Sequence, residues 1–203
     1  MKRTSLALVF ACIVTALAAQ AIKVKYQGTK PSISDFAWAL LSDYDNNAED
    51  TDESTAAMLQ AWKKYRKGAA LPKNETLTVD KKSGYVVFEE TYENQKLKIE
   101  MCYWNEADGK HKLIAYNVGF YTDGKYNPGQ YDGLFFYRYA DATKKMTLLD
   151  EAPGFEVQYC TDDGSQVSYT LPRTGKDITM TTWNPNGTTK QKTLKWNGSK
   201  FAE

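Results

Sequence analysis

The stretch 84-GYVVFEETYENQKLKIEMCYW-104 decides the fold that this 203-residue chain is expected to adopt. The apolar positions of its second half recur at every other residue, at Leu97, Ile99, Met101 and Tyr103. Such alternation is typical of a β-strand that turns one face toward a core. The two halves meet at Asn94-Gln95, and a connection this short allows only an antiparallel pair. The stretch therefore predicts a hairpin of two neighbouring strands.

The same alternation continues to the end of the chain. From Thr76 onward, short runs rich in β-branched and aromatic residues are separated by turn dipeptides such as Asp108-Gly109 and Asn186-Gly187, which suit tight hairpins. The runs cover residues 84–92, 96–104, 111–121, 133–139, 145–149, 155–160, 165–171, 177–183 and 188–196. Short connections predict a meander of about nine antiparallel strands, which either curls into a barrel or splits into two packed layers.

Two segments ahead of the strands have the period of an amphipathic helix. The first has Ser32 as its N-cap and apolar residues at helical spacing, at Ile33, Phe36, Ala37, Leu40, Leu41 and Tyr44. The second covers residues 52–68, with acids in its first turn and basic residues in its last turn. The sequence thus predicts an α+β fold in one domain: a helical part (22–70) packed on a large antiparallel meander (71–203).

The first 21 residues are typical of a secretory signal peptide. Two basic residues precede an apolar run from Leu6 to Ala18, and Ala19-Gln20-Ala21 supplies the small residues that a signal peptidase requires. The run is too short to span a bilayer as a helix. We expect cleavage near Ala21 and a secreted or periplasmic protein without a membrane span. A lipoprotein with an acylated Cys12 is the alternative.

The charge balance argues against nucleic acid as a partner. The full chain has a formal net charge of +1, and loss of Lys2 and Arg3 with the signal peptide lowers it by two, to −1. Binding to nucleic acid requires a basic patch, whereas the densest basic run, 63-KKYRK-67, forms the last turn of the second predicted helix, where it complements the helix dipole.

Two cysteines, Cys102 and Cys160, remain after removal of the signal peptide. Export through an oxidising compartment would allow them to form a disulfide, provided that their strands are neighbours. The sequence leaves the paired and the unpaired states open.

Most catalytic and cofactor motifs are absent from the sequence. His111 is the only histidine, which excludes a His-rich metal site, and it is expected on the surface at a strand edge. There is no Cys-x-x-Cys pair, nucleophile elbow, phosphate-binding loop or dinucleotide fingerprint. We therefore expect no cofactor.

The segment 43-DYDNNAEDTDES-54, between the predicted helices, matches an EF-hand calcium loop only in part. The matching positions 1, 3, 5 and 7 are Asp43, Asp45, Asn47 and Glu49. Position 6 is Ala48 instead of Gly, and position 12 is Ser54 instead of Glu. We expect a solvated acidic loop, and any calcium binding by these residues should be weak.

A glycan hydrolase would need two converging carboxylates. Glu89 and Glu90 are consecutive in a strand and point to opposite faces. Glu89 and Glu100 are nearly symmetric about Asn94-Gln95, so they would face each other across the hairpin. Among neighbouring lysines, such acids are more typical of a hydrated sheet face.

The stretch 116-YNVGFYTDGKYNPGQYDGLFFYRY-139 contains nine aromatic rings. Its strand 134–139 carries rings on both faces, so both faces must be covered, either by core and helices or by core and a ligand. The loop 126–131 is rich in Tyr, a residue that suits sugars and protein partners. Its candidate ligand contacts, with the preceding strand end, are Tyr121, Tyr126, Asn127 and Tyr131.

These observations predict an exported protein with a non-catalytic role. We expect it to bind a glycan, a small molecule or a protein partner through the aromatic loop. A carboxylate-dependent hydrolase acting on glycans and a structural or assembly protein are the alternatives.

Overall fold

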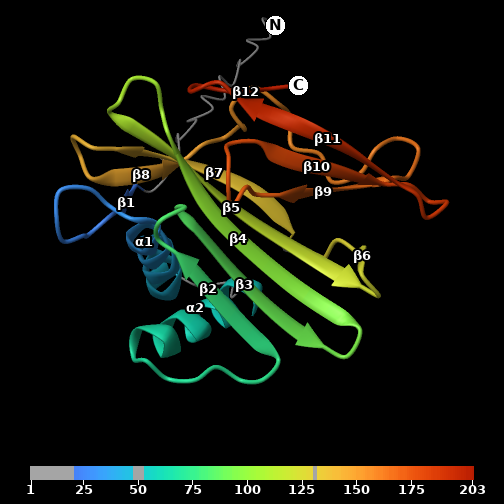
Figure 1. Ribbon diagram of the computed structural model, residues 1–203, viewed down its shortest axis with the longest axis horizontal. Coiled ribbons are helices and arrows are strands. Elements are labelled where there is room, and N and C mark those ends of the chain that lie inside the picture. The colour runs from blue at the N-terminus through green and yellow to red at the C-terminus, as the bar shows by residue number, and fades with distance from the viewer. Residues whose placement is uncertain (1–20, 48–52, 130–131) are drawn as a thin grey trace, which may run out of the picture.

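Figure 1 shows the computed structural model of the chain, which describes residues 21–47, 53–129 and 132–203. The predicted signal peptide lies outside the described residues, except for Ala21. Glu49 of the partial calcium motif and Tyr131 of the aromatic loop lie outside them as well. In the part of the chain that is described, no helix is long and apolar enough to cross a membrane.

The described residues form two helices and two antiparallel sheets. The helices are α1 (Ile33–Asn47) and α2 (Glu53–Arg66). The large sheet contains β1 (Ile22–Lys23), β2 (Glu75–Asp80), β3 (Tyr85–Tyr92), β4 (Gln95–Asn105), β5 (His111–Thr122), β6 (Lys125–Tyr126), β7 (Gly133–Ala140) and β8 (Lys145–Leu148). The small sheet contains β9 (Gln166–Thr170), β10 (Ile178–Trp183), β11 (Thr189–Trp196) and β12 (Phe201–Ala202). This inventory confirms the α+β class and the antiparallel strands.

The strands split into two layers instead of closing into one barrel. The large sheet has the order β1-β8-β7-β5-β4-β3-β2, with β6 paired to β5, and the small sheet has the order β12-β11-β10-β9. Figure 1 shows the large sheet strongly twisted and curled, with the helices on one side of it and the small sheet on the other. Hairpin connections therefore dominate both sheets, as the short turns predicted.

Helix α1 starts at a cap that the sequence encodes. The backbone N–H and the hydroxyl of Ser32 both donate to the Asp35 carboxylate, at 2.7 Å each. This contact satisfies a backbone donor that a helix start leaves unpaired. The helices then bury large side chains, including Phe36 and Trp62, against one face of the large sheet. On that face they meet Val86, Ile99 and other alternate residues of the central strands.

The opposite face of the large sheet is covered by the small sheet. Between the two sheets lies a second core in which Trp104 packs against Trp196 and Phe201, at ring-centroid distances of 6.0 and 5.2 Å. Strand β7 contributes to both cores, because Phe136 enters the inter-sheet core and Tyr139 the helix-side core. The two protein layers thus cover most of the aromatic rings on both faces of this strand, whereas Phe135 stays 40% exposed.

Cys102 and Cys160 are free thiols, so the disulfide that the sequence allowed is not formed. Cys102 lies on β4 and is 3% exposed in the inter-sheet core. Cys160 is exposed and forms only an isolated bridge with Gln166, at the start of β9. A disulfide required neighbouring strands, whereas β4 and β9 belong to different sheets.

The two thiols are expected to react with a thiol label under different conditions. Cys160 should react in the native protein, whereas Cys102 should react only after unfolding, because it is buried and burial raises the pKa of its thiol. In the chain from residue 22 onward, about one label per protein molecule should be incorporated in buffer and about two in denaturant. Cys160→Ser should abolish the native reaction, and a native wild-type protein without any reactive thiol would contradict the structure.

Candidate functional site

The aromatic loop turns its first tyrosine inward. Tyr126 is 5% exposed, and its ring packs against Tyr121 at 5.7 Å between centroids. Asp132 closes the loop by accepting the Gly129 N–H at 3.0 Å, and burial together with the Asp132 carboxylate raises the pKa of Tyr126. The Asn127 amide donates to a neighbouring side chain at 3.1 Å. Of the predicted ligand contacts, Tyr126 therefore lacks the exposed face that stacking on a ligand requires.

The predicted facing pair of glutamates has a different register. The turn between β3 and β4 is formed by Glu93 and Asn94, and Glu93 has φ +53°. The turn thus lies one residue earlier than the predicted turn at Asn94-Gln95. Glu89 is consequently opposite Lys98, and Glu100 is opposite Val87. The two acids share a face of the sheet but are displaced diagonally along it.

Lysines and a tyrosine hold these two carboxylates. Glu100 is 1% exposed and accepts hydrogen bonds from the Tyr85 hydroxyl at 2.7 Å and the Lys98 ammonium at 2.9 Å. Glu89 pairs with Lys96. Burial and the Glu100 charge raise the pKa of the Tyr85 hydroxyl. The carboxylates therefore serve as hydrogen-bonded parts of the sheet, and they do not converge on a shared space.

The partial calcium motif falls on a helix. Asp43, Asp45 and Asn47 belong to the last turns of α1, and Asp45 pairs with Lys63 of α2 at 2.9 Å. Residues two apart in an α-helix point to different sides, so Asp43 and Asp45 cannot serve as positions 1 and 3 of a calcium loop. Glu49 lies outside the described residues.

His111 belongs to the hairpin between β4 and β5. Its ring contacts the Asp108 carboxylate, which lowers the pKa of Asp108 to about 2. Ligand atoms of Glu106, Asp108 and His111 lie within 4.8 Å of one another. The Arg138 guanidinium, however, already binds Glu106 at 2.7 Å and would repel a metal cation. Asp108 also accepts the His111 backbone N–H at 3.0 Å, so the cluster serves to close the turn.

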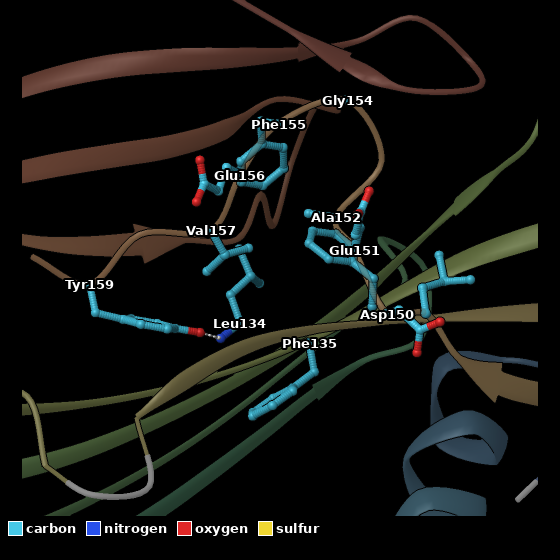
Figure 2. Close-up of a pocket in the computed structure, with 12 residues that line it drawn as sticks. Leu134, Phe135, Asp150, Glu151, Ala152, Gly154, Phe155, Glu156, Val157 and Tyr159 are labelled. Carbon is cyan, nitrogen blue, oxygen red and sulfur yellow. Dashed lines mark hydrogen bonds between the residues drawn. The ribbon is translucent and has the colours of Figure 1, made fainter. Parts of the chain in front are cut away.

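A groove that no sequence pattern predicted lies beside β7. Strand β7 pairs with β8 only through Tyr137–Ala140. After β8 the chain leaves the sheet: the Leu149 N–H still donates to the Phe136 C=O at 2.8 Å, and the crossing segment (residues 150–159) then leads toward the small sheet (Figure 2). The first half of β7 therefore has an open edge next to the crossing segment.

The crossing segment is held at both ends. The Phe201 N–H of β12 donates to the Pro153 C=O at 2.8 Å, and the Phe155 ring packs against the Phe201 ring at 5.8 Å between centroids. At its other end, the Tyr159 hydroxyl accepts the Leu134 N–H of β7 at 3.1 Å, the contact drawn as a dashed line in Figure 2. The wall of the groove is thus tied to both sheets.

The β7 groove, between β7 and the crossing segment, has a volume of about 730 Å³. Its apolar lining consists of Leu134, Phe136, Leu149, Ala152, Phe155 and Val157. Phe135 also borders it, but its ring projects from the opposite face of β7, where it packs on Tyr116 (Figure 2). In Figure 2, Glu156 lies toward the Tyr159 end, and Asp150 and Glu151 lie toward the opposite end. The described lining residues thus include three acids and no Lys, Arg or His.

The sequence contained one signal of this groove. The run 155-FEVQYC-160 predicted a strand, and side-chain exposure indeed alternates along it, with Phe155, Val157 and Tyr159 turned inward. The prediction of a paired strand is wrong, because within the described residues only Cys160 forms a bridge. A strand-like segment without a ladder partner therefore borders the groove.

No protein-family model, no curated protein and no solved structure matches the chain. The geometry of the β7 groove therefore carries the functional argument.

The wall of the groove depends on a glycine at its turn. Gly154 has φ +90°, and a Cβ there would lie 2.3 Å from the Phe201 carbonyl oxygen. Gly175 has a similar φ of +84° with nothing within 4 Å of such a Cβ, so it is a matched control. Gly154→Ala is expected to lower the free energy of unfolding by about 3 kcal/mol and Gly175→Ala by about 1 kcal/mol, as measured by urea denaturation. Equal losses would contradict the close approach of Gly154 to β12.

Proposed function

We propose that the protein is a non-catalytic binding protein whose ligand occupies the β7 groove. The observation that carries this proposal is a groove of about 730 Å³ whose described lining residues combine an apolar floor with three acids and include no basic residue. Sites for ligands have volumes of about 300–1,000 Å³, and a few polar groups among their apolar lining set specificity. In this groove the polar share is larger, because three carboxylates border it. The ligand should therefore combine an apolar part with positive charge.

A segment of a protein partner fits this description best. The carboxylates of Asp150, Glu151 and Glu156 lie on exposed residues, where they would attract basic side chains and set the orientation of a bound segment. Binding would take place outside the cytoplasm, as the signal-peptide pattern of the first 21 residues suggests.

The other expected functions have less support. A glycan hydrolase would rely on Glu89 and Glu100, and both are engaged by lysines away from the groove. Glycan binding by the aromatic loop would rely on Tyr126, which is 5% exposed. Assembly through an apolar sheet face would need a free face, whereas two protein layers cover the central strands.

Charge selectivity provides the test of the proposed function. Three small probes share an apolar phenyl group: 4-phenylbutylamine, its neutral N-acetyl derivative, and 4-phenylbutyrate. We expect the amine to bind most tightly and the carboxylate least, in titrations followed by two-dimensional NMR. The double variant Glu151→Gln with Glu156→Gln neutralises two of the acids. It should weaken binding of the amine about fivefold, which is the effect expected from the loss of two exposed charges.

A second double variant, Asp162→Asn with Glu203→Gln, removes two exposed acids that do not line the groove. It should leave amine binding unchanged and thereby separates a local effect from one of net charge. Equal affinity for the amine and the carboxylate, or equal weakening by both double variants, would refute the proposed site.

A further inference from the structure

Along the groove, the edge of β7 has two backbone groups without a hydrogen-bond partner among the described residues. They belong to Leu134 and Phe136, which are 4% and 2% exposed, so a guest can reach them only through the groove. Backbone groups of a strand alternate between its two sides, and the bond from Leu149 to the Phe136 C=O identifies the side that faces the groove. Leu134 is turned the same way, because its N–H donates to Tyr159. Among the described residues, the Leu134 C=O has no donor and the Phe136 N–H has no acceptor.

These two groups have the spacing of one step in a β-ladder. They flank Phe135, whose own N–H and C=O are directed to β5 on the other side of β7. A guest strand can bind both groups at once: one of its N–H groups donates to the Leu134 C=O, and one of its C=O groups accepts the Phe136 N–H. An unpaired strand edge is a template for such an addition.

The wall opposite has a matching character. The backbone groups of Phe155, Glu156 and Val157 form no hydrogen bond within the described part of the chain, although the segment has the alternating exposure of a strand. The groove therefore lies between two strand-like segments, and each of them has backbone groups that lack a partner among the residues described. Their alternate side chains supply an apolar surface, and carboxylates flank it at both ends.

We infer that the occupant of the β7 groove is an extended segment of a partner protein, which adds to β7 as an extra strand beyond the end of β8. This inference rests on the proposed function and specifies its ligand. On the order of four residues would pair, because only the first half of β7 is open. Alternate apolar side chains of the guest lie against the groove floor, and basic side chains reach the acids at the two ends.

The probe for this inference is a synthetic heptapeptide, acetyl-Lys-Val-Lys-Val-Lys-Val-Lys-amide. Two derivatives form a matched pair: one is N-methylated at each valine and the other at the three lysines that follow a valine. In an extended strand, the N–H groups of the two sets point to opposite sides. Strand addition requires that one derivative bind at least tenfold more weakly than the parent peptide, while the other binds within about threefold of it.

Amide hydrogen exchange gives a second readout. The Phe136 N–H should exchange at least tenfold more slowly when the parent peptide is saturating, because it gains an acceptor. The Phe135 N–H is already directed to β5 and should change much less. The double variant Glu151→Gln with Glu156→Gln should weaken peptide binding, which assigns the peptide to this groove.

The outcomes separate this inference from the proposed function. If the peptide binds with acid dependence but both N-methylated derivatives bind alike, strand addition is wrong and the groove remains a binding site. If 4-phenylbutylamine binds and the peptide does not, the peptide inference fails alone. If neither binds, both fail. Analytical sedimentation tests whether a second copy of the chain is the guest. If the protein forms a dimer that the peptide dissociates, the edge of β7 binds a second copy, and the inference that the guest is a different protein is overturned.

Discussion

The central strands of the large sheet are apolar on both faces, and the rest of the structure depends on covering them. Along β4, Ile99 and Met101 face the helices, whereas Cys102 and Trp104 face the small sheet. Leaving either face in water would expose side chains whose burial stabilises the fold by about 1.5–3 kcal/mol each. One layer cannot cover both faces, so the chain builds the helices before the large sheet and the small sheet after it.

This arrangement explains why a groove exists at β7. To reach the outer face, the chain must leave the sheet edge after β8 and cross over as residues 150–159. It departs while β7 is only half paired, since β8 ends at Leu148, opposite Tyr137. The crossing segment then stays close to β7 through two contacts, Leu149 to Phe136 and Leu134 to Tyr159. The backbone between those contacts is left open, so the groove is a consequence of the layer order.

Local patterns predicted the two helices and most of the strands, because helix and strand periods depend on neighbours in the sequence, although β2 (Glu75–Asp80) belongs to none of the predicted runs. The α+β class and the antiparallel strands followed from them. Two further predictions were wrong, the register of the β3–β4 hairpin and the pairing of residues 155–160, because they depended on a single turn and on distant contacts. Placing the turn at Asn94-Gln95 instead of Glu93-Asn94 displaced the partner of Glu100 by two residues, from Val87 to Glu89. The run 155–160 has the alternation of a strand, but pairing needs a neighbour that only the tertiary fold can supply. The groove, which draws on β7 and a segment some 20 residues away, could not be derived from either alone.

Directional hydrogen bonds complete the positioning that ring packing begins. Aromatic rings in the inter-sheet core tolerate sliding, because dispersion contacts have little directionality. Polar contacts between the layers fix the small sheet: the Asn117 amide donates to the Tyr169 C=O at 3.0 Å and the Trp104 indole to the Lys176 C=O at 2.8 Å. Tyr169 in turn binds the Gln158 N–H of the crossing segment at 2.9 Å through its hydroxyl. Because one tyrosine holds both the small sheet and the crossing segment, the width of the β7 groove is set by the same contacts that align the two sheets.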